Sequence, residues 1–173
     1  MSADWYKEQP TNRNFLNPIG YLLKLEKFEG VDFFCQRANV PDVTMPTTEV
    51  VSPFRNLPIV PSGGVAFGDF SVSFIVDEDL KNYNSIHKWI RDNGNADQMQ
   101  RTTKESDIYT NAQLHIVTSQ YNPAFVVEFR NIFPVSLTGL QFDATITDVE
   151  YITADVTFKH QQFFINDKNN HPL

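Results

Sequence analysis

The histidines are the side chains here that most readily bind a metal ion or transfer a proton near neutral pH. No two of them lie closer than 11 positions apart, and the chain contains neither an HExxH nor a CxxC motif. Because metal sites need ligands at short, fixed spacing, the sequence predicts no metal site. His87 falls beside the apolar stripe of a predicted helix, where a partly buried, hydrogen-bonded side chain is expected. The four are His87, His115, His160 and His171.

The chain has one cysteine, Cys35, which excludes an internal disulfide and any cysteine-based zinc cluster. Its neighbours are those of a hydrophobic strand, which favours an inert buried thiol over a nucleophile. No local pattern places a Ser or Cys nucleophile beside a base. The glycines at 63, 64 and 68 match neither a P-loop nor a dinucleotide fingerprint. We therefore expect neither an enzyme nor a cofactor.

The acidic run Asp77-Glu78-Asp79 superficially resembles the start of a calcium loop. Such a loop needs glycine at its sixth position and glutamate at its twelfth, where this chain has Asn82 and Lys88. The run is better interpreted as capping and dipole-pairing acids at a helix N-terminus.

Negative charge is concentrated in the C-terminal part of the chain. The net charge is −7, and no Lys or Arg occurs between Asn131 and Phe158. One interpretation is a solvated acidic sheet face; the other is a face that repels nucleic acid, since positive charge is what retains phosphates. Because side chains alternate between the two faces of a strand, only one of two acidic pairs can lie on the face that would repel nucleic acid. The sequence does not determine which pair it is. The candidates are Asp148 with Glu150, or Asp143 with Asp155.

The length and composition predict one folded domain. The chain has 173 residues, 41% of them hydrophobic and 15 of them Phe, which is enough to build a core without disulfides. No stretch approaches the roughly 18 consecutive apolar residues that span a bilayer, and the first eighteen residues lack the apolar segment of a secretory signal. We expect a protein made in the cytoplasm, with no membrane partner.

Alternating apolar residues predict most of the elements. Strands at 19–28 and 31–38 flank a Gly-containing turn and are expected to form a hairpin. Further strands are expected at 69–76, around 112–116, at 125–129 with a break at Phe133-Pro134, and at 152–158. The fold class is mainly β, an antiparallel sandwich or barrel with one packed α-helix and a long Pro-rich loop. The predicted organisation is an N-terminal arm at 1–18, one domain at 19–165 containing a loop at 39–67 and a helix at about 79–93, and a polar tail at 166–173.

The Pro-rich loop carries apolar residues that a solvated linker would not need. Five of the ten prolines lie in 39–67, which excludes a central strand. The loop either folds over its own core or buries its apolar side chains against another subunit. In the second case the interface residues are Val50, Val51, Phe54, Leu57 and Ile59.

The predicted helix has an apolar stripe formed by Leu80, Tyr83 and Ile90, with Ile86 or His87 between them. Its basic residues are expected on the solvent side, where they either contact a sheath subunit or remain merely solvated. They are Lys81, Lys88 and Arg91.

The order of elements and several stretches resemble the tail tube proteins of contractile-tailed, T4-like bacteriophages. Two such stretches are 33–41 (FFCQRANVP), which resembles their second strand, and 67–74 (FGDFSVSF), which resembles their strand before the helix. Asp77-Glu78 and Trp89 resemble the start and the tryptophan of that helix, and 133–140 with Thr157-Phe158 resembles the closing segment. The resemblance covers about 16–165. The long N-terminal arm and the tail after Ile165 depart from the family pattern. These departures are compatible with an alternative, a tube initiator or adaptor ring of the same fold.

The resemblance implies hexameric rings that stack into a tube inside a contractile sheath, in a virion tail through which the genome is ejected. The implied partners are further copies of the chain, the sheath protein, and baseplate and terminator proteins, with DNA passing through unbound. Two other classes remain open on the residues alone. One is a β-sandwich binding module using Trp5 or Tyr121, and the other is a hydrolase with a carboxylate pair.

Overall fold

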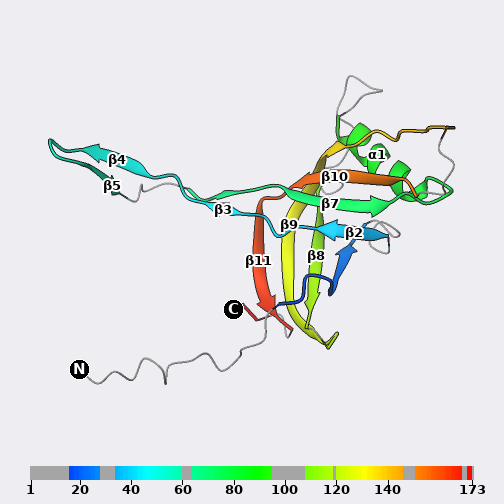
Figure 1. The fold of residues 1–173 in the computed structure, drawn as a ribbon, viewed down its shortest axis with the longest axis horizontal. Helices are drawn as coiled ribbons and strands as arrows, with labels where there is room; N and C mark the ends of the chain where they lie inside the picture. Colours follow the sequence, from blue (N-terminus) through cyan, green and yellow to red (C-terminus); the bar gives the residue numbers. More distant parts are fainter. Residues whose placement is uncertain are drawn as a thin grey trace.

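The computed structural model describes residues 16–27, 34–59, 64–94, 108–118, 120–145, 151–168 and 171–172. These ranges form a two-layered β body with one helix, from which a narrow ribbon projects (Figure 1). The strands are β1 (Tyr21–Leu25), β2 (Cys35–Ala38), β3 (Val43–Thr44), β4 (Thr48–Val51), β5 (Asn56–Ile59), β6 (Ala66–Phe67), β7 (Phe70–Ile75), β8 (Thr110–Val117), β9 (Pro123–Leu137), β10 (Thr153–Lys159) and β11 (Gln162–Asp167), and the helix is α1 (Lys81–Gly94).

One antiparallel sheet makes up the body, in the order β1-β8-β9-β10-β7-β2, with β11 also pairing with β9. The 15-residue strand β9 pairs with β8 and β11 along its first part and with β10 along its last part. The strands around β8 therefore run across those around β7 (Figure 1). This arrangement confirms the expected antiparallel, mainly β class with one helix.

The predicted break at Phe133-Pro134 is wrong, because β9 continues through it. Phe158 pairs with Pro134 and Thr157 pairs with Ser136, so Val135 is an extra residue in β9 at a bulge. Proline has no N–H to give to the ladder, and a bulge is one of the places in a sheet that tolerate it.

The predicted hairpin at 19–38 is also wrong. β1 pairs with β8, and β2 pairs with β7, so the two strands lie at opposite ends of the sheet order. These two ends nevertheless lie close together, since β1 and β2 contact each other and the side chains of Tyr21 and Cys35 interact. Val31 and Phe33 lie outside the described residues. An alternating pattern fixes which side chains face inward, but it does not fix the partner strand.

The core confirms the predicted alternation in the two central strands of one layer. Phe70, Val72 and Phe74 of β7 are buried, as are Ala154, Val156 and Phe158 of β10. The ring of Phe70 stacks on that of Phe129 with centroids 4.3 Å apart, which joins the two layers. Each fully buried side chain of this size contributes about 1.5–3 kcal/mol to folding.

The helix begins at Lys81 rather than at residue 79. The predicted stripe is confirmed in part, because Ile86 is buried and Tyr83 and Ile90 pack against the core. Leu80 lies before the helix with φ 57° and is 42% exposed, so it is not a core residue. The buried positions are Asn82, Ile86 and Trp89. His87, expected to be partly buried, is exposed.

A reciprocal turn determines where the helix starts. The backbone N–H of Asn82 donates to Asp77 Oδ1 at 3.4 Å, and that of Asp77 donates to Asn82 Oδ1 at 3.3 Å. Asn82 Nδ2 also donates to the carbonyl of Ile75 at 2.8 Å, which ties the helix start to β7. Asp77 therefore acts as the expected cap, whereas the first turn of the helix contains no acidic residue.

The described residues of the segment 39–67, namely 39–59 and 64–67, form a β-ribbon and not a loop. β3 pairs with β6 near the body, and β4 pairs with β5 farther out. Pro58 fits into β5 because a two-stranded ribbon leaves the outer edge of each strand open. At the other end of the chain, β11 runs to Asp167, and Asn166 is buried and bridges to Pro172. The predicted boundary between the domain and the tail, at 165/166, therefore falls inside a strand.

Candidate assembly surfaces

The outer ribbon, formed by β4 and β5, is amphipathic. Val50 lies opposite Leu57, and Thr48 lies opposite Ile59, so Val50, Leu57 and Ile59 share one face. On the other face Asn56 Nδ2 donates to Glu49 Oε2 at 3.0 Å. One side of the ribbon thus carries Val50, Leu57 and Ile59, while the other holds this polar pair together with Val51 and Pro58.

All five predicted interface residues lie on this ribbon and are exposed. Phe54, at the turn, is 98% exposed and Val51 is 82% exposed. The expectation that this segment folds over its own core is therefore wrong. The ribbon instead extends away from the body (Figure 1).

The root of the ribbon is fixed by a close backbone approach. The N–H of Gly68 donates to the carbonyl of Asp42 at 2.9 Å. A Cβ at Gly68 would lie 1.8 Å from Asp42 Oδ1, so the exposed side chain of Asp42 would have to turn away to make room for it. Phe67, beside this glycine, packs against His160 and Phe163.

The acidic candidates are only partly described. Asp155 is exposed on β10, where it accepts a hydrogen bond from Ser73 Oγ of β7. Asp143 is exposed after β9, and its carboxylate accepts bonds from the backbone N–H and the hydroxyl of Thr145, which lower the pKa of Asp143. Asp148 and Glu150 lie outside the described residues. Asp155 shares its sheet face with two basic side chains, Arg37 and Lys159, and with small hydroxyl side chains, namely Ser71, Ser73, Ser136, Thr153 and Thr157.

The three basic residues of α1 are exposed, as expected. Lys81 Nζ lies 2.5 Å from Asp79 Oδ2, and this hydrogen bond raises the pKa of Lys81 and lowers that of Asp79. Residues 81, 88 and 91 are spaced so that they follow one side of a helix. A basic strip formed by Lys81, Lys88 and Arg91 therefore runs along the solvent side of α1.

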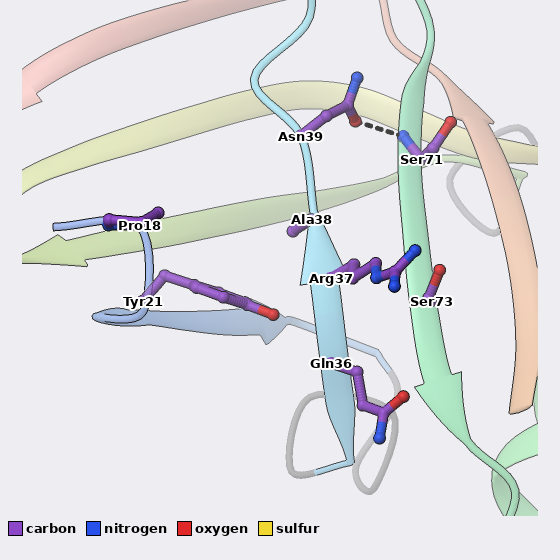
Figure 2. A pocket seen from close by; sticks show the side chains of 8 residues that line it. All are labelled: Pro18, Tyr21, Gln36, Arg37, Ala38, Asn39, Ser71 and Ser73. Atoms are coloured by element: carbon purple, nitrogen blue, oxygen red, sulfur yellow. Dashed lines mark hydrogen bonds between the residues drawn. The ribbon is translucent and has the colours of Figure 1, made fainter.

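An open groove of about 440 Å³ marks the place where the two ends of the sheet meet. Figure 2 shows Tyr21 pointing across the groove toward β2. It also shows the hydrogen bond that the backbone N–H of Ser71 donates to Asn39 Oδ1. Burial, with a smaller contribution from Cys35, raises the pKa of Tyr21 to about 12, and burial also raises that of Cys35. Both groups are therefore protonated near neutral pH, as expected for an unreactive thiol.

The described residues contain no group of three or more His, Cys, Asp or Glu side chains arranged to hold a metal ion. In the same part of the chain no helix is long and apolar enough to cross a membrane. Two features were not predicted from the sequence: the contact between Tyr21 and Cys35, and the ring cluster at the ribbon root. Both join residues far apart in the chain, and no local pattern signals such contacts.

The family model for phage tail tube proteins matches residues 8–166. The chain therefore belongs to the phage tail tube protein family, a family of structural and not enzymatic proteins. No curated protein sequence was found to match it.

Solved structures share the fold at low sequence identity. A chain of the anti-feeding prophage cap, described as a tube-terminating cap, is 18% identical with a TM-score of 0.65, covering 93% of this chain and 97% of that one. A chain from the sheath–tube complex of the PVC extracellular contractile injection system is 14% identical with a TM-score of 0.61, covering 96% and 99%. Hcp1 from Escherichia coli EAEC 042 is 11% identical with a TM-score of 0.53, covering 88% and 94%.

Proposed function

We propose that this chain forms hexameric rings that stack into the inner tube of a contractile phage tail, and that the genome is ejected through this tube. Membership of the tail tube family gives the class of protein. The observation that carries the proposal is the apolar face of the ribbon, where Val50, Leu57 and Ile59 lie together and exposed.

The ribbon is the proposed contact between subunits. Large apolar patches are rarely left exposed on a soluble monomer, and the ribbon holds its patch away from its own body. A neighbouring subunit would therefore cover this patch. The proposed interface consists of this face, Phe54 at the turn and Val51 on the other face, which are Val50, Val51, Phe54, Leu57 and Ile59.

The acidic residues are the proposed lining of the lumen. Carboxylates along the wall would let DNA pass by repelling its phosphates, and Lys159 on the same face is already paired with Asp69. The candidates are Asp143, Asp148, Glu150 and Asp155, and the two described members of this set are exposed. The sheet face that carries Asp155 also presents Ser and Thr hydroxyl groups, which are readily hydrated, as expected for a wall in contact with water.

The basic strip on α1 is the proposed docking surface for the sheath. It presents positive charge on a particle of net charge −7, so a sheath protein with a complementary acidic surface would be recognised by charge. Baseplate and terminator proteins are the proposed partners at the ends of the tube. The proposed location is the virion tail, after synthesis in the host cytoplasm.

A ring of the same fold at the end of the tube is the second candidate. The match to a tube-terminating cap, with its TM-score of 0.65, supports this alternative. Such a ring would use the same ribbon contacts within the ring but would stack on one side only.

Light scattering after size exclusion, together with negative-stain microscopy of the purified chain, tests the proposal. We expect rings of six subunits, and filaments of stacked rings at high concentration. Single rings that never stack would favour the end-ring candidate. A stable monomer at all concentrations would overturn both candidates and favour a binding module.

A further inference from the structure

His160 lies in the short connection between β10 and β11, among three phenyl rings. Its ring centroid is 5.3 Å from that of Phe129, 5.6 Å from that of Phe163 and 5.8 Å from that of Phe67. Phe163 in turn packs against Phe67 and Phe129, with centroids 5.4 and 5.9 Å apart. The four side chains form one cluster, which we call the root cluster.

Neither nitrogen of the imidazole has a hydrogen-bond partner within the described chain, although both atoms are buried. A neutral imidazole tolerates this at a modest cost, whereas a buried imidazolium without partners is far less stable. Burial accordingly lowers the pKa of His160. The geometry therefore favours the neutral ring.

The charged groups around the cluster do not reverse this preference. Asp69 favours the protonated ring and Lys159 opposes it, but these two are already paired, with Lys159 Nζ 2.9 Å from Asp69 Oδ1. Glu128 and Arg130, beside Phe129 on β9, pair with each other at 3.3 Å. Of the other carboxylates on these elements, Asp42 contacts Gly68 at the ribbon root, and Asp167 lies at the far end of β11, opposite Phe125.

The root cluster joins the ribbon to the body. Phe67 ends β6, and β6 is held to β3 by a ladder of just two residue pairs, Val43 with Phe67 and Thr44 with Ala66. A ladder this short depends on side-chain packing for its stability. The packing of Phe67 on His160 and Phe163 provides it.

We propose that His160 is a pH-operated latch on the ribbon: the neutral ring packs in the root cluster and holds Phe67, whereas the ring that has taken a proton from solvent leaves the cluster and loosens β3 and β6. A histidine with a lowered folded-state pKa contributes its full stabilisation above about pH 6.5, the usual value. This contribution decreases as the pH falls below 6.5, and the decrease ends at the lowered pKa. The latch is a property of the single chain and stands whether or not the ribbon contacts a neighbour.

Hydrogen exchange between pH 7.5 and 5, corrected for intrinsic exchange rates, tests the latch in the full chain. We expect the protection of amides in Val43–Thr44 and Ala66–Phe67 to fall by up to about tenfold for each unit by which the pKa is lowered. Amides of Phe70–Ile75 in the core should keep their protection. His160→Phe, which keeps an uncharged ring in place, should abolish the pH dependence, and the matched control His87→Phe, at an exposed site, should leave it unchanged.

A second variant covers the case in which His160→Phe does not fold. Phe67→Ala removes the ribbon side of the root cluster, so the ribbon root should be loose at every pH. An NMR titration of the His160 ring should then show a pKa closer to the usual value than in the wild type. The latch is wrong if ribbon protection in the wild type does not change with pH, if His160→Phe retains the wild-type change, or if Phe67→Ala leaves the His160 titration unmoved.

Discussion

Val50 lies directly opposite Leu57 in the outer ribbon, and both side chains are exposed on the same face. Cross-strand neighbours of this kind form a single contact surface. The pair is therefore the place where a change in the ribbon should alter assembly without altering the fold.

The double variant Val50→Asp, Leu57→Asp should give soluble monomers that no longer form rings, because two carboxylates would have to be buried in the contact. The melting temperature should hardly change, since neither residue touches the core. Light scattering and thermal unfolding measure the two effects. Asn56→Ala, which changes the ribbon on the opposite face without adding charge, should still assemble. Normal filaments from the double variant would rule out the ribbon as the interface.

The buried face of α1 gives a prediction about stability. Ile86 is fully buried, so Ile86→Ala should cost about 2–5 kcal/mol of unfolding free energy. Leu80→Ala should change it by no more than about 0.5 kcal/mol, because Leu80 is exposed and lies outside the helix. Chemical denaturation of both variants compares them directly. Equal costs at the two positions would contradict the packing described for the helix.

The basic strip can be tested separately from the fold. Changing Lys81, Lys88 and Arg91 together to Glu should leave the melting temperature nearly unchanged, because exposed charge pairs contribute only about 0–1 kcal/mol. The triple variant should nevertheless weaken assembly of the sheath on the tube, as judged by electron microscopy of tails. Full-length, contractile tails built from this variant would show that the strip has no docking role.

We expect the protein not to bind DNA. The wild type, at net charge −7, should not retard duplex DNA at physiological salt. Asp143→Lys combined with Asp155→Lys should produce retardation that weakens steeply as salt is added, if these residues line the lumen. A gel-shift series in increasing salt measures both. Tight binding by the unmodified protein would contradict the proposed lumen.

The sequence predicted burial better than it predicted pairing. Phe70, Val72 and Phe74 were placed correctly because strand alternation has a period of two residues. The partner of Leu23 is Leu114, far along the chain, and no turn signal near β1 indicates it. The hairpin prediction failed because a local turn between 28 and 31 was the only pairing signal available.

The start of the helix and the ribbon show two other limits. Leu80 looked like a helical core residue by spacing, but the turn between Asp77 and Asn82 places it in a left-handed conformation outside the helix. The prolines correctly excluded a central strand, yet they do not exclude a ribbon in which each strand needs only one partner. Exposure of Val50 and Leu57 depends on where the ribbon points, and at its root the N–H of Gly68 donates to the carbonyl of Asp42, a contact that no local pattern indicates.

The long strand β9 has a mechanical consequence. It belongs to both layers of the body, pairing with β11 as far as Arg130, with β8 as far as Ile132 and with β10 from Phe133 onward. Asn131 has φ 53°, a conformation that asparagine tolerates well, at the point where the partners change. A load applied to one layer is therefore carried to the other along a covalent backbone, and the two layers cannot slide apart unless the hydrogen bonds of β9 break along its length.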